Sequence, residues 1–113
     1  MSEARLATSV LASALIRKAQ GEGGFAAVLA KGDAEAGAML VILLDRGGGS
    51  MLLERILRPN GEYGWEDVAG TGSNSESVDR FLSKRRRSDP DLWLIELTVA
   101  WAERFAAEMN EAD

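Results

Sequence analysis

The most apolar stretch of the chain is residues 37–45 (GAMLVILLD), which turn-forming residues flank on both sides. Its two alternating sets of side chains are both apolar, namely Ala38, Leu40, Ile42 and Leu44 on one side and Met39, Val41 and Leu43 on the other. A strand with one solvated face alternates apolar and polar residues, so this pattern predicts a central strand covered on both faces. The stretch is short for a helix and glycines follow at 47–49, which favours a strand over a short buried helix.

Residues 3–20 predict an N-terminal helix, because apolar side chains recur there at helical spacing. The expected buried stripe consists of Leu6, Val10, Leu11, Ala14 and Leu15. Glycines at positions 21, 23 and 24 are suited to end this helix. Either Ser2 or Ser9 is a suitable N-cap, and the pattern does not choose between them.

Two later segments also have helical spacing. Residues 75–87 place Val78, Phe81 and Leu82 on one side, and Ser73 and Glu76 have the spacing of a capping box. A last helix is expected to begin at a Thr98 cap and to run to about residue 110, with residues 111–113 as a frayed tail. Its expected buried stripe is Val99, Ala102, Phe105, Ala106 and Met109.

Four further strands are predicted at residues 25–31, 50–58, 62–68 and 92–97. The glycines at 47–49 and the sequence Pro59-Asn60-Gly61 mark the tight turns between neighbouring strands. The order is therefore helix, four strands, helix, strand, helix, which predicts a single α+β domain over residues 1–113. We expect a mostly antiparallel sheet of about five strands with helices packed on it, and the helix before the last strand allows that strand to lie parallel to an earlier one.

Two charged residues lie in the middle of the third predicted strand. Glu54 and Arg55 are consecutive, so their side chains point to opposite faces of the sheet and cannot pair with each other. Charges in a largely apolar strand need partners or water. Two interpretations remain open, in which these residues either form salt bridges with neighbouring strands or line a shallow pocket.

The composition excludes several classes of site. The chain has no cysteine and no histidine, so disulfides, thiolate metal sites and nucleophile–histidine pairs are absent. The formal net charge of -5 disfavours broad nucleic-acid binding, although it is compatible with a local basic patch. Residues 1–18 lack the pattern of a signal peptide, and no stretch has the length of a membrane span. A cytoplasmic protein without a membrane partner is expected.

A cluster of cations marks the end of the second predicted helix. This basic helix end comprises Arg80, Lys84, Arg85, Arg86 and Arg87. Cations at a helix C-terminus interact favourably with the macrodipole, which alone accounts for them, but they also suit phosphate, nucleic acid or an acidic partner. The glycine-rich loop before the same helix, with Gly72 and Ser73, is a second candidate for anion binding. It contains only part of a dinucleotide fingerprint and no P-loop lysine, so a simple linker with a helix cap is favoured.

A metal-dependent nuclease is a further alternative, since such enzymes place carboxylates and a lysine around a sheet. The candidate ligands are Asp33, Asp45 and Glu54, assisted by Arg55. Carboxylates are suitable magnesium ligands. The expected Glu-x-Lys motif is replaced by Glu54-Arg55-Ile56, however, and this departure makes the nuclease interpretation weak.

Two segments resemble a known family. Residues 22–37, from EGGF to KGDAEAG, and residues 85–96 (RRRSDPDLWLIE) are similar to domain-of-unknown-function family 1491, short proteins known mainly from alphaproteobacteria. The resemblance covers roughly residues 4–97 and does not extend into residues 98–113. The family has no established activity, so it implies no catalytic residues. It does imply a free-standing bacterial protein with a single domain in the cytoplasm.

The sequence thus favours a noncatalytic protein-interaction or assembly module. Only three helices are available to cover both faces of the central strand, so either they divide between the two faces or a second subunit covers one of them. A homodimer is therefore expected, alongside an unidentified protein partner, and no cofactor is predicted. The alternative is an anion or nucleic-acid binding domain that uses the basic helix end at residues 80–87.

Overall fold

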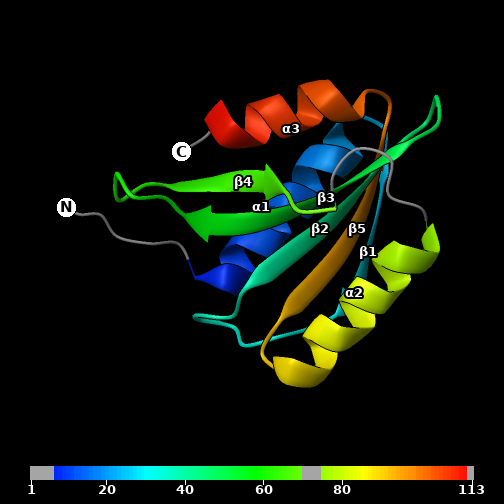
Figure 1. Cartoon of the computed structure of the whole chain (residues 1–113). Helices are drawn as coiled ribbons and strands as arrows, with labels where there is room; N and C mark the ends of the chain where they lie inside the picture. The colour runs from blue at the N-terminus through cyan, green and yellow to red at the C-terminus, as the bar shows by residue number, and fades with distance from the viewer. Residues whose placement is uncertain (1–6, 70–74, 112–113) are drawn as a thin grey trace.

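The computed structural model describes residues 7–69 and 75–111, which form three helices and five strands. The helices are α1 (Thr8–Gly21), α2 (Ser75–Ser88) and α3 (Ala102–Glu111). The strands are β1 (Phe25–Ala30), β2 (Met39–Asp45), β3 (Ser50–Leu57), β4 (Tyr63–Asp67) and β5 (Trp93–Val99). This order confirms the predicted α+β arrangement, and Figure 1 shows it as one layered unit.

The five strands form one open sheet in the order β1-β5-β2-β3-β4. All neighbouring strands are antiparallel except β2 and β5, which run parallel with Met39 opposite Trp93 and Asp45 opposite Val99. The last strand of the chain thus inserts between β1 and β2, which confirms the prediction of a mostly antiparallel sheet. This insertion makes β2 central and leaves β1 and β4 at the two edges.

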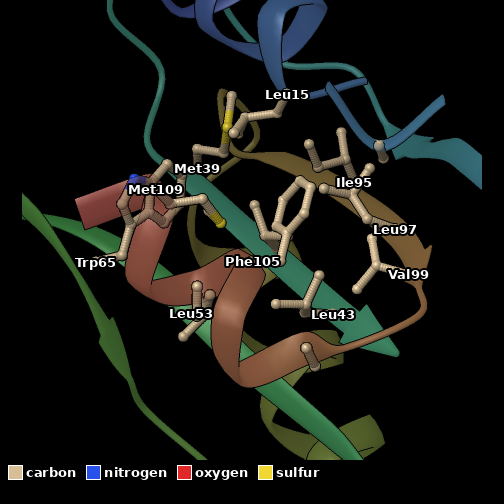
Figure 2. Close-up of a cluster of buried hydrophobic side chains, with 14 of the residues drawn as sticks. Leu15, Met39, Leu43, Leu53, Trp65, Ile95, Leu97, Val99, Phe105 and Met109 are labelled. Carbon is tan, nitrogen blue, oxygen red and sulfur yellow. The ribbon is translucent and has the colours of Figure 1, made fainter. Parts of the chain in front are cut away.

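Both faces of the sheet are covered by helices. On one face, α1 and α3 contribute Leu15 and Phe105 to the larger core, in which β2, β3 and β5 place their alternate residues (Figure 2). On the other face, Leu82 of α2 packs with Leu40, Leu52, Leu92 and Leu94. The predicted two-sided burial of β2 is confirmed, because Met39, Leu40, Val41 and Leu43 are all buried.

Helix α1 matches the predicted stripe only in part, because Leu15 is buried and Leu11 packs against the core as predicted. Thr8, Ala12, Leu15 and Ala19 are its buried residues, whereas Val10 is 48% exposed. The prediction was wrong at Val10 because the amphipathic pattern is weak, and small alanines pack more closely against the sheet than a larger side chain would. Leu6 and Ser2 lie outside the described residues.

Backbone hydrogen bonds cap both ends of α1. Ala7 is the N-cap and its side chain makes no capping bond, so the Ser9 cap was wrong. Instead, the N–H groups of Thr8 and Ser9 donate to the carbonyls of Glu35 and Ala34 at 3.3 and 2.9 Å. At the other end, Gly23 has a φ of 83° and its N–H donates to the carbonyl of Gln20, which is the predicted glycine-dependent stop.

Helix α3 begins later than predicted and has a different cap. Thr98 belongs to β5, so it does not cap the helix as the sequence suggested. The Asp45 carboxylate at the end of β2 takes that role, because its Oδ2 accepts the N–H of Ala102 at 2.8 Å. A cap supplied from 57 residues earlier in the chain carries no local sequence signal. The predicted buried residues Ala102, Phe105, Ala106 and Met109 are confirmed.

Candidate functional site

The free edge of β1 is the most unusual surface of the sheet. Its sequence, FAAVLA, contains no charge and no proline, and its burial pattern is largely exposed. Phe25, Val28 and Leu29 are 67%, 46% and 44% exposed. One side of β1 pairs with β5, and among the described residues no strand pairs with the other side. Natural proteins usually protect such an edge with charge or proline, and β1 has only a bulge between Val28 and Ala30.

The apolar surface of β1 continues onto the sheet. Phe25 lies opposite Thr98 of β5, which in turn lies opposite Leu44 of β2. These three residues form a row across the face that carries α2, and Thr98 and Leu44 are half-buried. The guanidinium of Arg46 lies 5.7 Å from the centre of the Phe25 ring. The edge and this row together form one continuous surface, which we call the β1 surface.

The opposite edge of the sheet is protected. Strand β4 carries exposed Glu66 and Asp67, and Arg58 reaches Glu66 across the strands at 3.5 Å. The side chain of Asn110 on α3 also hydrogen-bonds to both backbone polar groups of Trp65. Its Oδ1 accepts the Trp65 N–H at 2.8 Å, and its Nδ2 donates to the Trp65 carbonyl at 3.4 Å. Charge and an amide side chain therefore close this edge, whereas no residue of β1 itself is charged and the nearby Arg46 lies against the Phe25 ring.

The basic helix end is only partly available for a ligand. Arg85 donates to both carboxylate oxygens of Glu54 at 3.0 and 2.8 Å, and Arg80 pairs with Glu76 one turn away at 2.9 Å. The Glu54 carboxylate and its hydrogen bonds raise the pKa of Arg85 further above its ordinary value. The remaining cations, Lys84, Arg86 and Arg87, are exposed on α2. Gly72 and Ser73, the other predicted anion ligands, lie outside the described residues.

The three candidate metal ligands are not brought together. Asp33 accepts the N–H groups of Glu35 and Ala36 in its own turn. Asp45 accepts the N–H groups of Ala102 and Gly47, and these two hydrogen bonds lower its pKa below the ordinary value. Glu54 is engaged by Arg85. Across residues 7–69 and 75–111, no group of three carboxylates has the arrangement of a metal site.

The two segments that resemble a known family lie against each other. The Asp33 N–H donates to the carbonyl of Asp91 at 3.0 Å, and the Trp93 indole N–H donates to the carbonyl of Asp33 at 2.7 Å. Gly32 and Gly37 both contact the Asp91 carbonyl so closely that a Cβ at either position would overlap it. The turn at residues 32–37 is therefore held in place by the start of β5.

That turn forms one wall of a cavity of about 500 Å³. The start of α1, the start of β2 and the side chains of Arg55 and Tyr63 complete its lining. The Arg55 guanidinium lies 4.2 Å from the centre of the Tyr63 ring, on the face of the sheet opposite Glu54. Of the two interpretations, the salt bridge applies to Glu54 and the pocket lining applies to Arg55. The partner of Glu54 comes from helix α2, however, and not from a neighbouring strand.

Sequence reasoning identified Arg55 but missed the groups around it. Thr8, Glu35 and Tyr63 join Arg55 only because β3 and β4 lie beside the N-terminal end of α1. It also missed the exposed edge of β1, because the strand order was not predictable. The uncharged composition of residues 25–30 was the one available signal for that edge.

Comparisons with known proteins agree with this architecture. A family model described as "Protein of unknown function (DUF1491)" matches residues 6–107, so it includes most of the segment that the sequence resemblance left out. A comparison with curated proteins gives no match. None of the described helices is long and apolar enough to cross a membrane.

Solved structures with the same fold come from two organisms. A crystal structure of a DUF1491 family protein from Caulobacter crescentus is 35% identical, with a TM-score of 0.79, and the match covers 89% of this chain and 94% of that one. An NMR structure of a DUF1491 family protein from the same organism is 34% identical, with a TM-score of 0.79 and coverages of 92% and 94%. A solution structure of a protein from A. tumefaciens is 31% identical, with a TM-score of 0.75 and coverages of 91% and 93%.

Proposed function

The chain belongs to the DUF1491 family of proteins of unknown function, and from this premise we propose that it is a noncatalytic assembly module of the bacterial cytoplasm that forms a homodimer through β1. The observation that carries the proposal is the contrast between the two edges of the sheet. Charge and Asn110 protect β4, whereas the edge of β1 is apolar and uncharged. Such an edge is a template for another strand.

A second copy is the occupant that fits this edge. Under a two-fold axis perpendicular to the sheet, β1 of each subunit runs antiparallel to the other, so the two edges satisfy each other's backbone groups. A strand without charges brings no like charges together in such a pair. Phe25, Val28 and Leu29, which are the exposed large apolar side chains of β1, would be covered in the same interface.

The proposal is tested by mass measurement with light scattering at several protein concentrations and at low and high salt. We expect a dimer at roughly 100 µM that is insensitive to salt, because backbone pairing and apolar contact are weakly screened. Val28→Lys places a charge on the edge and is expected to give a monomer. Val10→Lys is the matched control, since Val10 has a similar exposure of 48% but lies on α1, and this variant should remain dimeric.

Two results would contradict the proposal of a dimer through β1. A wild-type protein that stays monomeric at all concentrations would show that β1 does not pair with itself. Equal masses for Val28→Lys and wild type, with both proteins folded by circular dichroism, would place any dimer interface elsewhere. Phe25→Lys provides a second charged variant on the same surface in case Val28→Lys fails to fold.

A second candidate function is the binding of an anion or nucleic acid by the basic helix end. Lys84, Arg86 and Arg87 are exposed, and Arg86 shares a hollow with Lys31 beside Pro90, which favours a local positive surface. Arg80 and Arg85 are paired with carboxylates, so the cations available to a ligand on α2 are Lys84, Arg86 and Arg87. Binding to a single-stranded oligonucleotide should fall steeply with salt and disappear in a Lys84→Gln, Arg86→Gln, Arg87→Gln triple variant. Salt-independent or absent binding would dismiss this candidate.

A further inference from the structure

Among residues 7–69 and 75–111, Arg55 is a half-buried cation without a carboxylate partner. Lys18, Arg58 and Arg85, the other half-buried cations among the described residues, each form an ion pair with a glutamate. In the part of the chain that the structure describes, no carboxylate lies within ion-pair distance of Arg55. Its Nε atom is buried and has no hydrogen-bond partner there. A half-buried guanidinium with unmet hydrogen-bonding capacity is expected to be completed by an anionic group.

The surroundings of Arg55 form a space of suitable size for a small molecule. The cavity has a volume of about 500 Å³, within the range of small-molecule sites, and Leu11, Ala36, Ala38 and Met39 supply the apolar part of its lining. Tyr63 lies against the guanidinium at 4.2 Å and limits its orientation. Thr8 connects two parts of the lining, because its hydroxyl donates to the carbonyl of Gly37 at 3.0 Å. The cation is therefore held at one side of a space whose lining has both polar and apolar parts.

The charge balance selects the class of ligand. Among the described residues, Arg55 is the one cation in the lining of this cavity, and Glu35 is another lining residue. The single positive charge of Arg55 would leave part of the charge of a dianion such as phosphate unpaired. A singly charged carboxylate matches the planar fork of one guanidinium, and the body of the same molecule can contact the apolar part of the lining. We propose that this cavity binds a small monocarboxylate with an apolar body, with Arg55 as the group that receives the carboxylate.

The proposal is tested with benzoate as the probe, added to the 113-residue protein and followed by NMR and calorimetry. We expect saturable binding with a dissociation constant of about 1 mM or tighter, and chemical-shift changes at residues 35–39, 55 and 63. Benzyl alcohol, which has the same ring without the charge, should bind about tenfold or more weakly. Arg55→Gln should weaken benzoate binding by a similar factor, and Arg55→Lys should fall between the two because it keeps the charge without the fork.

Arg58→Gln is the matched control for Arg55→Gln. Arg58 is the half-buried cation that directly follows β3, and it pairs with Glu66 instead of facing the cavity. This variant should bind benzoate as the wild type does. Absence of saturable binding to the wild type, equal binding of benzyl alcohol, or tighter binding of inorganic phosphate than of benzoate would each overturn the proposal. Retained benzoate binding in a folded Arg55→Gln variant would do the same. These outcomes are independent of whether β1 forms a dimer.

Discussion

Glu54 on β3 and Arg85 on α2 form a two-point ion pair that joins the helix to the sheet. Both carboxylate oxygens accept hydrogen bonds, at 3.0 and 2.8 Å, and the two side chains are only 20% and 26% exposed. Helix α2 contributes one buried apolar side chain, Leu82, to the core, and Val78 and Phe81 pack beside it with partial exposure. The ion pair therefore helps to fix the orientation of α2 on the sheet, because apolar packing alone constrains this helix weakly.

We expect Glu54→Gln and Arg85→Gln each to lower the free energy of unfolding by about 1–2 kcal/mol. Each variant removes one partner and leaves the other partly buried without its counter-charge. The double variant should cost less than the sum of the single variants, with a coupling free energy of about 1 kcal/mol in a double-mutant cycle measured by urea denaturation. Arg87→Gln, at an exposed position of the same helix, should change stability by less than about 0.5 kcal/mol. Additive single and double variants would show that the pair contributes no net coupling.

The cap of α3 should be pH dependent. The N–H groups of Ala102 and Gly47 hold the pKa of Asp45 below its ordinary value of 3.8, so the folded protein favours the charged form. The resulting stabilisation is fully present above the unfolded pKa and is lost as the pH falls through the lower folded pKa. Asp45→Asn should therefore be less stable than wild type at pH 7, and the two unfolding curves should converge as the pH falls below 3.8.

A control separates this cap from other titrating groups. The pKa of Glu108 is also lowered, first by its hydrogen bond from Lys18 and then by Arg104, but Glu108 titrates in both proteins and cancels in the difference. Thr98→Val, at the cap position that the sequence predicted, should give a difference from wild type that does not change with pH. A constant difference between Asp45→Asn and wild type from pH 7 to pH 2.5, about one unit below the ordinary aspartate value, would contradict the assigned role.

The fold was predictable to the extent that its signals are local. Apolar periodicity and turn residues marked all the helices and strands, and the two-sided apolar pattern identified β2 as central. The order of strands was not predictable, because β5 pairs with β1 and β2, which lie more than 45 residues away in the sequence. Rules based on neighbouring residues cannot predict the pairing of strands that lie so far apart in the sequence.

The same limit applies to the sites. Glu54 and Arg55 were marked by their positions in an apolar strand, and their alternation correctly assigned them to opposite faces. Their partners, Arg85 and Tyr63, come from different elements and depend on how α2 and β4 pack against β3. The Thr98 cap failed for a related reason, since a distant carboxylate satisfied the start of α3.

The turn at residues 32–37 should tolerate no added carbon at Gly37. A Cβ at this position would overlap the Asp91 carbonyl, so Gly37→Ala requires a backbone shift between the turn and β5. We expect a loss of about 2–3 kcal/mol in the free energy of unfolding by chemical denaturation. Gly21→Ala is the matched control, because its Cβ would meet no atom within 4 Å, and it should be neutral or stabilising by up to about 1 kcal/mol. Equal stabilities for these two variants would show that the turn moves freely.

Asn110 should govern the protection of the β4 edge. Its Oδ1 is the acceptor for the Trp65 N–H, and Trp65 itself is buried, so Asn110→Ala leaves a backbone donor without its partner. We expect a loss of about 1 kcal/mol in stability and roughly tenfold faster hydrogen exchange at the Trp65 amide, measured by NMR. Asn110→Asp keeps an acceptor and should retain most of the protection, while Glu111→Ala on the same helix should leave the exchange rate unchanged. Unchanged exchange in Asn110→Ala would mean that the Trp65 N–H is protected by β3 and β4 alone, and the contrast with β1 would then rest on the charges of β4.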